Sequence, residues 1–243
     1  MFSSDFAKGN PCAVAELEKW PSKSELLSIT RKLGQPVTSF VVESGSGAGF
    51  DIRWFSLEGE INLCGHGSLG AGASLISKYG SESVTLNSQH GQVVITETND
   101  RYKIVLPSWN AQPVDMVKIG LNTPVVDAYS TRDVILVLES EAAVAHFVPD
   151  YDKISKIEDF HAVIVTAKSS PDSYVLRYFA PKIGIPEDLA TGSAQCSLAP
   201  YWFRKLGANK LSARQLSTSG GYFEIEPASD SSIVVSAQVK LRS

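Results

Sequence analysis

Short runs rich in β-branched and aromatic residues alternate with turn-forming pairs along most of the chain. Runs of this kind predict strands, and in the first 110 residues they occur at Val37–Glu43, Asp51–Ser56, Ser83–Leu86, Gln92–Glu97 and Tyr102–Leu106. The pairs Asn99-Asp100 and Ser44-Gly45 lie between neighbouring runs and favour antiparallel pairing. The alternation starts again after about Asp115. We therefore expect a strand-rich fold with few helices.

An internal repeat divides the chain. The segment Phe50–Gly80 resembles Tyr174–Gly207. Arg53-Trp54-Phe55 matches Arg177-Tyr178-Phe179 at an offset of 124 residues, whereas the glycines that follow match at an offset of 127, so the second loop is three residues longer. Each copy predicts a strand, an acidic loop, a turn of small residues and a helix ended by a glycine.

The composition of the two predicted helices indicates how they pack. Gly70 and Gly72 lie inside the first helix, where each glycine costs about 1 kcal/mol relative to alanine. Close packing must offset this cost, which predicts a central helix wrapped by a sheet. Pro200 predicts a kink in the second helix. We expect an α+β fold of two pseudo-symmetric domains, residues 1–110 and 111–243, with a final strand that can cross back to the first half.

Composition and charge narrow the class of protein. With 43% hydrophobic and 20% charged residues, the 243-residue chain is typical of a soluble globular protein. The formal charge of −4 argues against a nucleic-acid partner. The cysteines, Cys12, Cys64 and Cys196, are odd in number and lack C-x-x-C spacing, which argues against disulfides and zinc sites. We expect a cytoplasmic protein without a membrane segment or a metal site.

Each copy of the repeat offers one carboxylate in the loop before its helix. Glu60 lies five residues before Gly65, and Asp188 lies four before Gly192. Pseudo-symmetry would bring both acids to a cleft between the halves, where helix N-termini attract anions by about 0.3–1 kcal/mol each. Two carboxyl groups whose pKa values are pushed apart can act as acid and base. The alternative interpretation is that both are capping or solvated loop residues.

Three motifs, taken together, carry a family resemblance. They are Gly9-Asn10-Pro11, then RWFSLEGEINLCGHGSLGAGA, then RYFAPKIGIPEDLATGSA. In this order, over nearly the whole chain, they resemble the phenazine-biosynthesis PhzF-like isomerases, which are relatives of diaminopimelate epimerase. The resemblance implies two epimerase-like domains, each a β-barrel-like sheet around a central helix. It also implies a cofactor-independent active site between them and a homodimer.

The resemblance further implies roles for individual residues. The family's acid/base glutamate falls on Glu60 and its motif aspartate on Asp188. The residues that match its substrate-binding positions are Asn10, Gly65, His66, Gly192 and Ser193, together with Gln89 or His90. These matches imply an isomerase that moves a proton between carbons of a small carboxylate-bearing metabolite, as the founding member does on a dihydro-hydroxyanthranilate ring.

The chain departs from the family pattern in two places. Ser219 stands where many relatives carry an arginine in Q-x-S-x-R-G-G, and Arg214 compensates only if its side chain reaches the same cleft. The strand before the Gly9-Asn10-Pro11 loop is cut short at Met1. The first departure motivates an alternative function, a catalytically silent protein that binds a metabolite or another protein.

Other motifs favour structural roles. A two-thiol racemase is disfavoured because the counterpart of Cys64 is Thr191 and because Cys196 lies one turn inside its helix, so we expect Cys196 in the core. The G-x-G-x-x-G match that starts at Gly65 lacks the acidic strand end of a dinucleotide site. Arg53 and Arg177 recur in both copies, which predicts a shared structural role such as binding loop carbonyls or the acids.

Overall fold

The chain divides into two compact units. The computed structural model describes residues 1–45, 47, 49–62 and 64–242. Unit 1 contains Met1–Ser3, Asn10–Val105 and Ser236–Ser243, and unit 2 contains Ser4–Gly9 and Leu106–Val235. Each unit thus includes a piece of chain that is distant in sequence from its main part.

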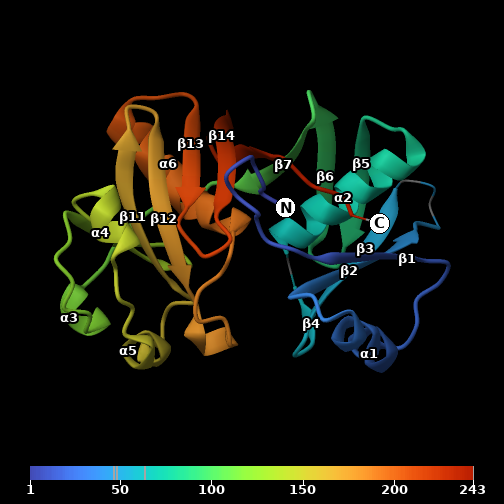
Figure 1. The fold of residues 1–243 in the computed structure, drawn as a ribbon, viewed down its shortest axis with the longest axis horizontal. Helices are drawn as coiled ribbons and strands as arrows, with labels where there is room; N and C mark the ends of the chain where they lie inside the picture. Colours follow the sequence, from blue (N-terminus) through green and yellow to red (C-terminus); the bar gives the residue numbers. More distant parts are fainter. Residues whose placement is uncertain (46, 48, 63, 243) are drawn as a thin grey trace. The chain divides into compact units, whose positions relative to one another are not determined.

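Unit 1 is a twisted sheet folded around one helix. Its strands lie in the order β1 (Ala13–Leu17), β2 (Val37–Glu43), β3 (Phe50–Ser56), β5 (Ser83–Ser88), β6 (Gly91–Thr98) and β7 (Arg101–Pro107), and β4 (Glu60–Ile61) pairs with β3. Helix α1 (Lys23–Leu33) contacts β2 and β3, and helix α2 (Gly65–Tyr79) packs against β1, β2, β5 and β6 (Figure 1). The predicted strands of this half are confirmed.

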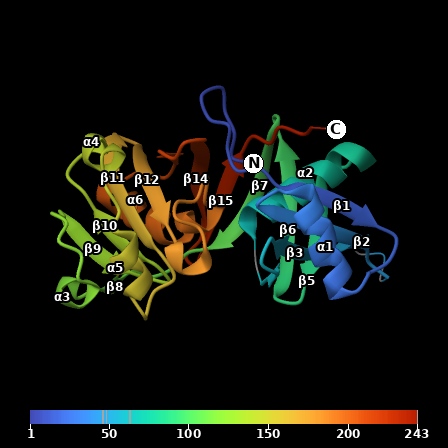
Figure 2. The same ribbon diagram turned by 60° about the horizontal axis from the view of Figure 1, so that its bottom comes forward.

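Unit 2 contains most of the remaining strands, and the last of them, β15 (Ser232–Ala237), continues into unit 1 from Ser236. These strands lie in the order β15, β14 (Gly221–Ser229), β13 (Leu211–Gln215), β12 (Ser173–Phe179), β11 (Val163–Ser170), β10 (Val134–Val137), β9 (Asp127–Ser130) and β8 (Gln112–Pro113). Figure 2 shows β9 and β8 at one edge of this sheet. The helical elements are α3 (Met116–Ile119), α4 (Glu141–Ala145), α5 (Tyr151–Lys156), η1 (Pro181–Ile183), η2 (Gly192–Ala194) and α6 (Gln195–Leu206). None of the helices in the described part of the chain combines the length and the apolar character needed to span a bilayer.

The two units share one pattern of strand pairing. From β1 to β6 the pairings are parallel, antiparallel, parallel and antiparallel. From β10 to β14 the same sequence recurs. The antiparallel pairing expected at the Ser44-Gly45 and Asn99-Asp100 turns is confirmed, whereas strands joined through a helix pair in parallel. The repeat is therefore structural, and the expected α+β class is confirmed.

Both repeat helices end as the sequence predicts. Gly80 and Gly207 adopt left-handed φ angles of 66° and 65°, and each donates its N–H to a carbonyl of the last helical turn. Gly72 brings α2 close to the sheet, because a Cβ placed on it would lie 2.5 Å from Ile95. The central, closely packed helix is thus confirmed. Helix α6 continues through Pro200.

Candidate active site

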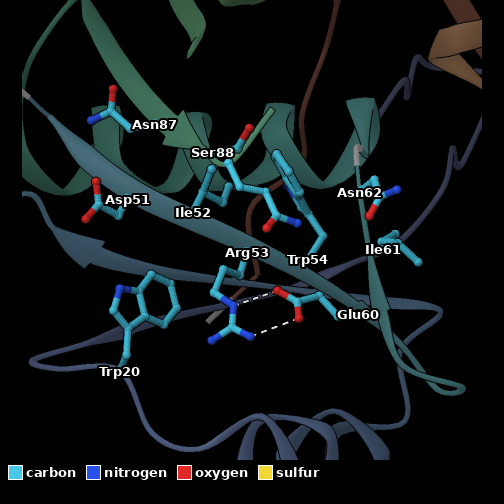
Figure 3. A pocket seen from close by; sticks show the side chains of 11 residues that line it. Trp20, Asp51, Ile52, Arg53, Trp54, Glu60, Ile61, Asn62, Asn87 and Ser88 are labelled. Carbon is cyan, nitrogen blue, oxygen red and sulfur yellow. Dashed lines mark hydrogen bonds and ion pairs between the residues drawn. The ribbon is translucent and has the colours of Figure 1, made fainter. Parts of the chain in front are cut away.

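Glu60 is held between two cations at the start of β4. Arg53 donates from Nε to Oε1 at 2.6 Å and from Nη2 to Oε2 at 2.9 Å, and Lys23 Nζ lies 3.2 Å from Oε2 (Figure 3). The hydrogen bonds from Arg53 and the nearby Lys23 hold the pKa of Glu60 below its ordinary value. Glu60 is therefore an ionised carboxylate whose two oxygens are already engaged.

The second copy repeats this arrangement with a different acid. Arg177 donates from Nε and Nη2 to the two oxygens of Glu187 at 2.7 and 2.9 Å, and its Nη1 donates to the Phe147 carbonyl at 2.7 Å. The shared structural role expected for Arg53 and Arg177 is confirmed. Glu187 also lies at the 127-residue offset from Glu60. The residue that the repeat relates to Glu60 is therefore Glu187, one position before Asp188. That Glu60 and Asp188 act together stays a prediction.

Asp188 is fixed in the turn that precedes η2. Its Oδ2 accepts the Thr191 hydroxyl at 2.5 Å, and its Oδ1 accepts the Leu189 N–H at 2.9 Å. Gln215, which is buried, donates to the Asp188 carbonyl at 2.7 Å and accepts the Thr191 N–H at 2.8 Å. This network sets the position of the Asp188 carboxylate.

The start of α2 is formed by Cys64, Gly65 and His66. Cys64 is the N-cap, and its Sγ accepts the Gly67 N–H at 3.4 Å and lies 3.4 Å from His66 Nδ1. Burial lowers the pKa of His66 to about 3, so its ring is neutral at pH 7. Apart from its chain neighbours and the backbone of its own helix, no atom of the described residues lies within 4 Å of a Cβ built on Gly65. A ligand can therefore approach this backbone closely.

The starts of the two repeat helices differ in their side chains. In unit 2, the residues corresponding to Gly65 and His66 are Gly192, which is buried, and Ser193. Cys196 is buried one turn further on, and burial raises the pKa of its thiol to about 12. Its expected position in the core is confirmed, and a thiol of this kind is a poor nucleophile or base at neutral pH.

One cavity of unit 1 brings two of the predicted site residues together. Glu60 and Gln89 both line a space of about 310 Å³ next to β3, and His90 does not. Trp54 also lines it, is 2% exposed, and its Nε1 has no hydrogen-bond partner among the described residues. Figure 3 shows Trp20, Asp51 and Asn87 around the same space.

The other predicted site residues are divided between the units. Asn10 is buried in unit 1 and donates its N–H to the Met1 carbonyl at 2.9 Å, while Asp188, Gly192 and Ser193 belong to unit 2. That these groups meet at one substrate stays a prediction. In the described part of the chain, His, Cys, Asp and Glu side chains do not gather in groups of three or more that could hold a metal ion.

Arg214, the candidate replacement for the arginine that many relatives carry at the position of Ser219, is bound to other side chains. Arg214 donates to Glu141 Oε1 at 2.6 Å and to Ser169 Oγ at 3.1 Å, so its guanidinium is engaged beside α4. Arg132 lies outside all of the sequence motifs, yet its Nη2 lies 3.3 Å from Ser193 Oγ. The only sequence signal was a pair of charges, Arg132-Asp133, directly before an apolar run.

Comparisons with known proteins agree with the motifs. The family model for PhzC-PhzF, described as phenazine biosynthesis-like protein, matches residues 1–226. An uncharacterized isomerase of Vibrio cholerae is 59% identical over 244 residues, which span 100% of this chain and 87% of that protein. A putative phenazine biosynthesis PhzC/PhzF protein of Clostridium difficile, solved by crystallography, is 33% identical with a TM-score of 0.90, covering 100% of this chain and 94% of that one.

A more distant solved structure extends the fold similarity. A probable proline racemase of Agrobacterium radiobacter has a TM-score of 0.65 at 12% identity, with 98% of this chain and 91% of that chain covered. This likeness concerns the fold alone, and it agrees with the expected epimerase-like architecture. On the family match and the relatives named as isomerases, the chain belongs to the PhzC/PhzF family of phenazine biosynthesis-like proteins and is an isomerase.

Proposed function

We propose that this isomerase moves a proton between carbons of a small carboxylate-bearing metabolite by carboxylate acid/base catalysis, without a cofactor. The observation that carries the proposal is Asp188, a carboxylate fixed by Thr191, Leu189 and Gln215 directly before Gly192 and Ser193. Free N–H groups at a helix start bind a carboxylate, and the adjacent acid can then exchange a proton with the bound molecule.

The proton-transfer roles of Asp188 and Glu60 are not equally supported. Both oxygens of Glu60 already accept hydrogen bonds from Arg53, and the lowered pKa keeps the group ionised. Protonation of Glu60 therefore works against its bonds with Arg53. Asp188 is held by hydrogen bonds with Thr191 and Leu189 in the turn that leads to Gly192 and Ser193, and this position supports Asp188 as the group that touches the substrate.

Exchange of substrate hydrogen with solvent tests this proposal. The protein would be incubated in D₂O with dihydro-hydroxyanthranilate and with a panel of small cyclic and aromatic carboxylates, and deuterium at carbon would be followed by NMR. We expect exchange with at least one compound, and Asp188→Asn to slow it about 10²–10⁴-fold, as is typical for loss of a general acid or base. Unchanged exchange in a folded Asp188→Asn protein would refute the role of Asp188.

The repeat supplies a matched control for Glu60. Glu60→Gln and Glu187→Gln each weaken one arginine clamp. If Glu60 transfers protons, Glu60→Gln lowers kcat far more than Glu187→Gln does, at a similar loss of thermal stability. If the two variants behave alike, Glu60 has the structural role that Glu187 has.

A second candidate function is a catalytically silent binding protein. It is favoured by Ser219, where relatives carry arginine, and by the engagement of Arg214 with Glu141. Under this alternative a carboxylate raises the melting temperature by mass action, but no deuterium enters its C–H positions. Exchange in the wild-type protein would exclude it.

A further inference from the structure

We infer that Arg132 is a further substrate-binding residue, which presents one edge of its guanidinium beside Ser193 to a carboxylate group. This inference rests on the proposed function, because it names the side chain that would grip the substrate's anionic group in unit 2. The inference is based on the contacts of Arg132. Asp133, Tyr178 and Trp109 fix the position of its guanidinium, and one nitrogen, Nη1, stays available for a ligand.

Asp133 explains why Arg132 is rigid. The Asp133 side chain is 0% exposed in the turn between β9 and β10, and a buried carboxylate needs a paired cation. Arg132 supplies it, with Nε 3.1 Å from Oδ1 and Nη2 2.8 Å from Oδ2. This bidentate pair fixes the plane of the guanidinium, because both donors on one side must point at the carboxylate.

Three further contacts complete the setting of Arg132. Its Nη2, which also binds Asp133, lies 3.1 Å from the Tyr178 hydroxyl and 3.3 Å from Ser193 Oγ, so its two N–H groups are shared among three acceptors. Its Cζ lies 5.0 Å from the centroid of the Trp109 ring, in a cation–π arrangement. The guanidinium is thus held on an aromatic surface at the start of η2.

The remaining nitrogen, Nη1, sets Arg132 apart from a purely structural arginine. Among the described residues Nη1 has no hydrogen-bond partner, and the Arg132 side chain is 36% exposed. In Arg177, by contrast, Nη1 donates to the carbonyls of Val144, Ala145 and Phe147. An exposed, pre-oriented guanidinium edge beside a hydroxyl fits the oxygen atoms of a carboxylate, since charge-assisted hydrogen bonds of this kind are short and strong.

Direct binding of small carboxylates tests the inference. Anthranilate and benzoate, with anthranilamide and benzamide as uncharged counterparts, would be titrated into the full-length protein by calorimetry. We expect the acids to bind more tightly than the amides. Arg132→Met should weaken binding of the acids about 10-fold or more, the scale of a lost hydrogen bond to a charged group, and should leave binding of the amides unchanged.

Two more variants keep the result interpretable. Because Arg132→Met leaves Asp133 buried without its cation, the double variant Arg132→Met/Asp133→Asn removes the charge as well and should lose the same affinity while folding. Arg132→Lys keeps the charge but not the planar edge, and should lie between the wild type and Arg132→Met. The control Arg214→Met removes an arginine already engaged with Glu141 and should bind the acids as the wild type does.

The outcomes separate this inference from the proposed function. Wild-type affinity for the acids in a folded Arg132→Met/Asp133→Asn protein, equal binding of acids and amides, or no binding of any acid by the wild type would each overturn the role of Arg132. Binding that depends on Arg132 without deuterium exchange would keep that role and refute the isomerisation. Deuterium exchange together with unchanged binding of the acids in the Arg132 variants would support the isomerisation and refute the role of Arg132.

Discussion

Both copies of the repeat contain an arginine that binds a glutamate through two hydrogen bonds, which we call the arginine clamp. They differ in the contacts made at the end of the neighbouring strand. In unit 2, the Leu216 N–H donates to the Leu176 carbonyl at 2.8 Å, and the Gln215 side chain bridges the loop from Asp188 to Thr191. In unit 1, the residue at the position of Gln215 is Ser88, whose hydroxyl binds the Gly91 carbonyl within its own turn. The space next to β3 therefore stays open as a cavity.

The aromatic residue after each clamp arginine shows the same difference. Tyr178 in unit 2 accepts a hydrogen bond from Arg132, whereas Trp54 in unit 1 has a buried Nε1 without a partner among the described residues. Features present in both copies, such as the arginine–glutamate pairs and the terminal glycines, hold the fold. Groups present in only one copy, such as Asp188 and Arg132, are where we expect the chemistry.

Removing the clamp arginines should have the largest effect on stability. Arg177 is 13% exposed and binds carbonyls in addition to Glu187, whereas Arg53 is 29% exposed and binds Glu60. Arg177→Met should lower the free energy of unfolding by about 3 kcal/mol, because a partly buried acid and three backbone carbonyls lose their donor. Arg53→Met should cost about 1–2 kcal/mol. Urea denaturation measures both, and an equal loss would contradict the comparison.

Giving α2 the residue that α6 has at the equivalent position should have an intermediate effect on stability. The residue of α6 that corresponds to Gly72 is Ala199. Gly72→Ala should destabilise by about 1–3 kcal/mol, since its Cβ would meet Ile95 at 2.5 Å and overpacking outweighs the gain in helix propensity. Melting temperatures check this, with the exposed Ser77→Ala as a control in the same helix. A rise on Gly72→Ala would show that α2 is not closely packed.

The pH dependence of the Glu60 clamp should give the smallest effect. The pKa of Glu60 is lower in the folded than in the unfolded state. The ionised carboxylate therefore adds its full contribution to stability above the unfolded-state pKa of about 4.3, and this contribution is lost as the pH falls through the folded-state pKa. The stability difference between the wild type and Glu60→Gln, about 1 kcal/mol at pH 7, should therefore shrink in acid. A difference that stays constant down to pH 3 would contradict the ionised clamp.

Local features of this fold were predictable from the sequence, and features that depend on distant contacts were not. The strands near Val37 and Gln92 and the helix end at Gly80 follow from periodicity and turn chemistry. The parallel pairing of β3 with β5 depends on how α2 packs, which a strand pattern does not encode. The contact of Arg132 with Ser193 joins residues 61 positions apart, and the alignment of Glu60 with Glu187 required the clamp geometry to separate Glu187 from Asp188.

The division of the chain has a consequence for synthesis in the cell. Unit 1 includes residues from Ser236 onward, and in it Ser3 bridges to Gln238. A ribosome that has translated residues 1–105 has therefore not yet made all of this unit, and the unit is complete only after residues 236 onward have been made. Dividing the chain after residue 105 would leave unit 1 without the residues from Ser236 onward and unit 2 without Ser4–Gly9. Expressing the two units separately would therefore require these segments as added peptides.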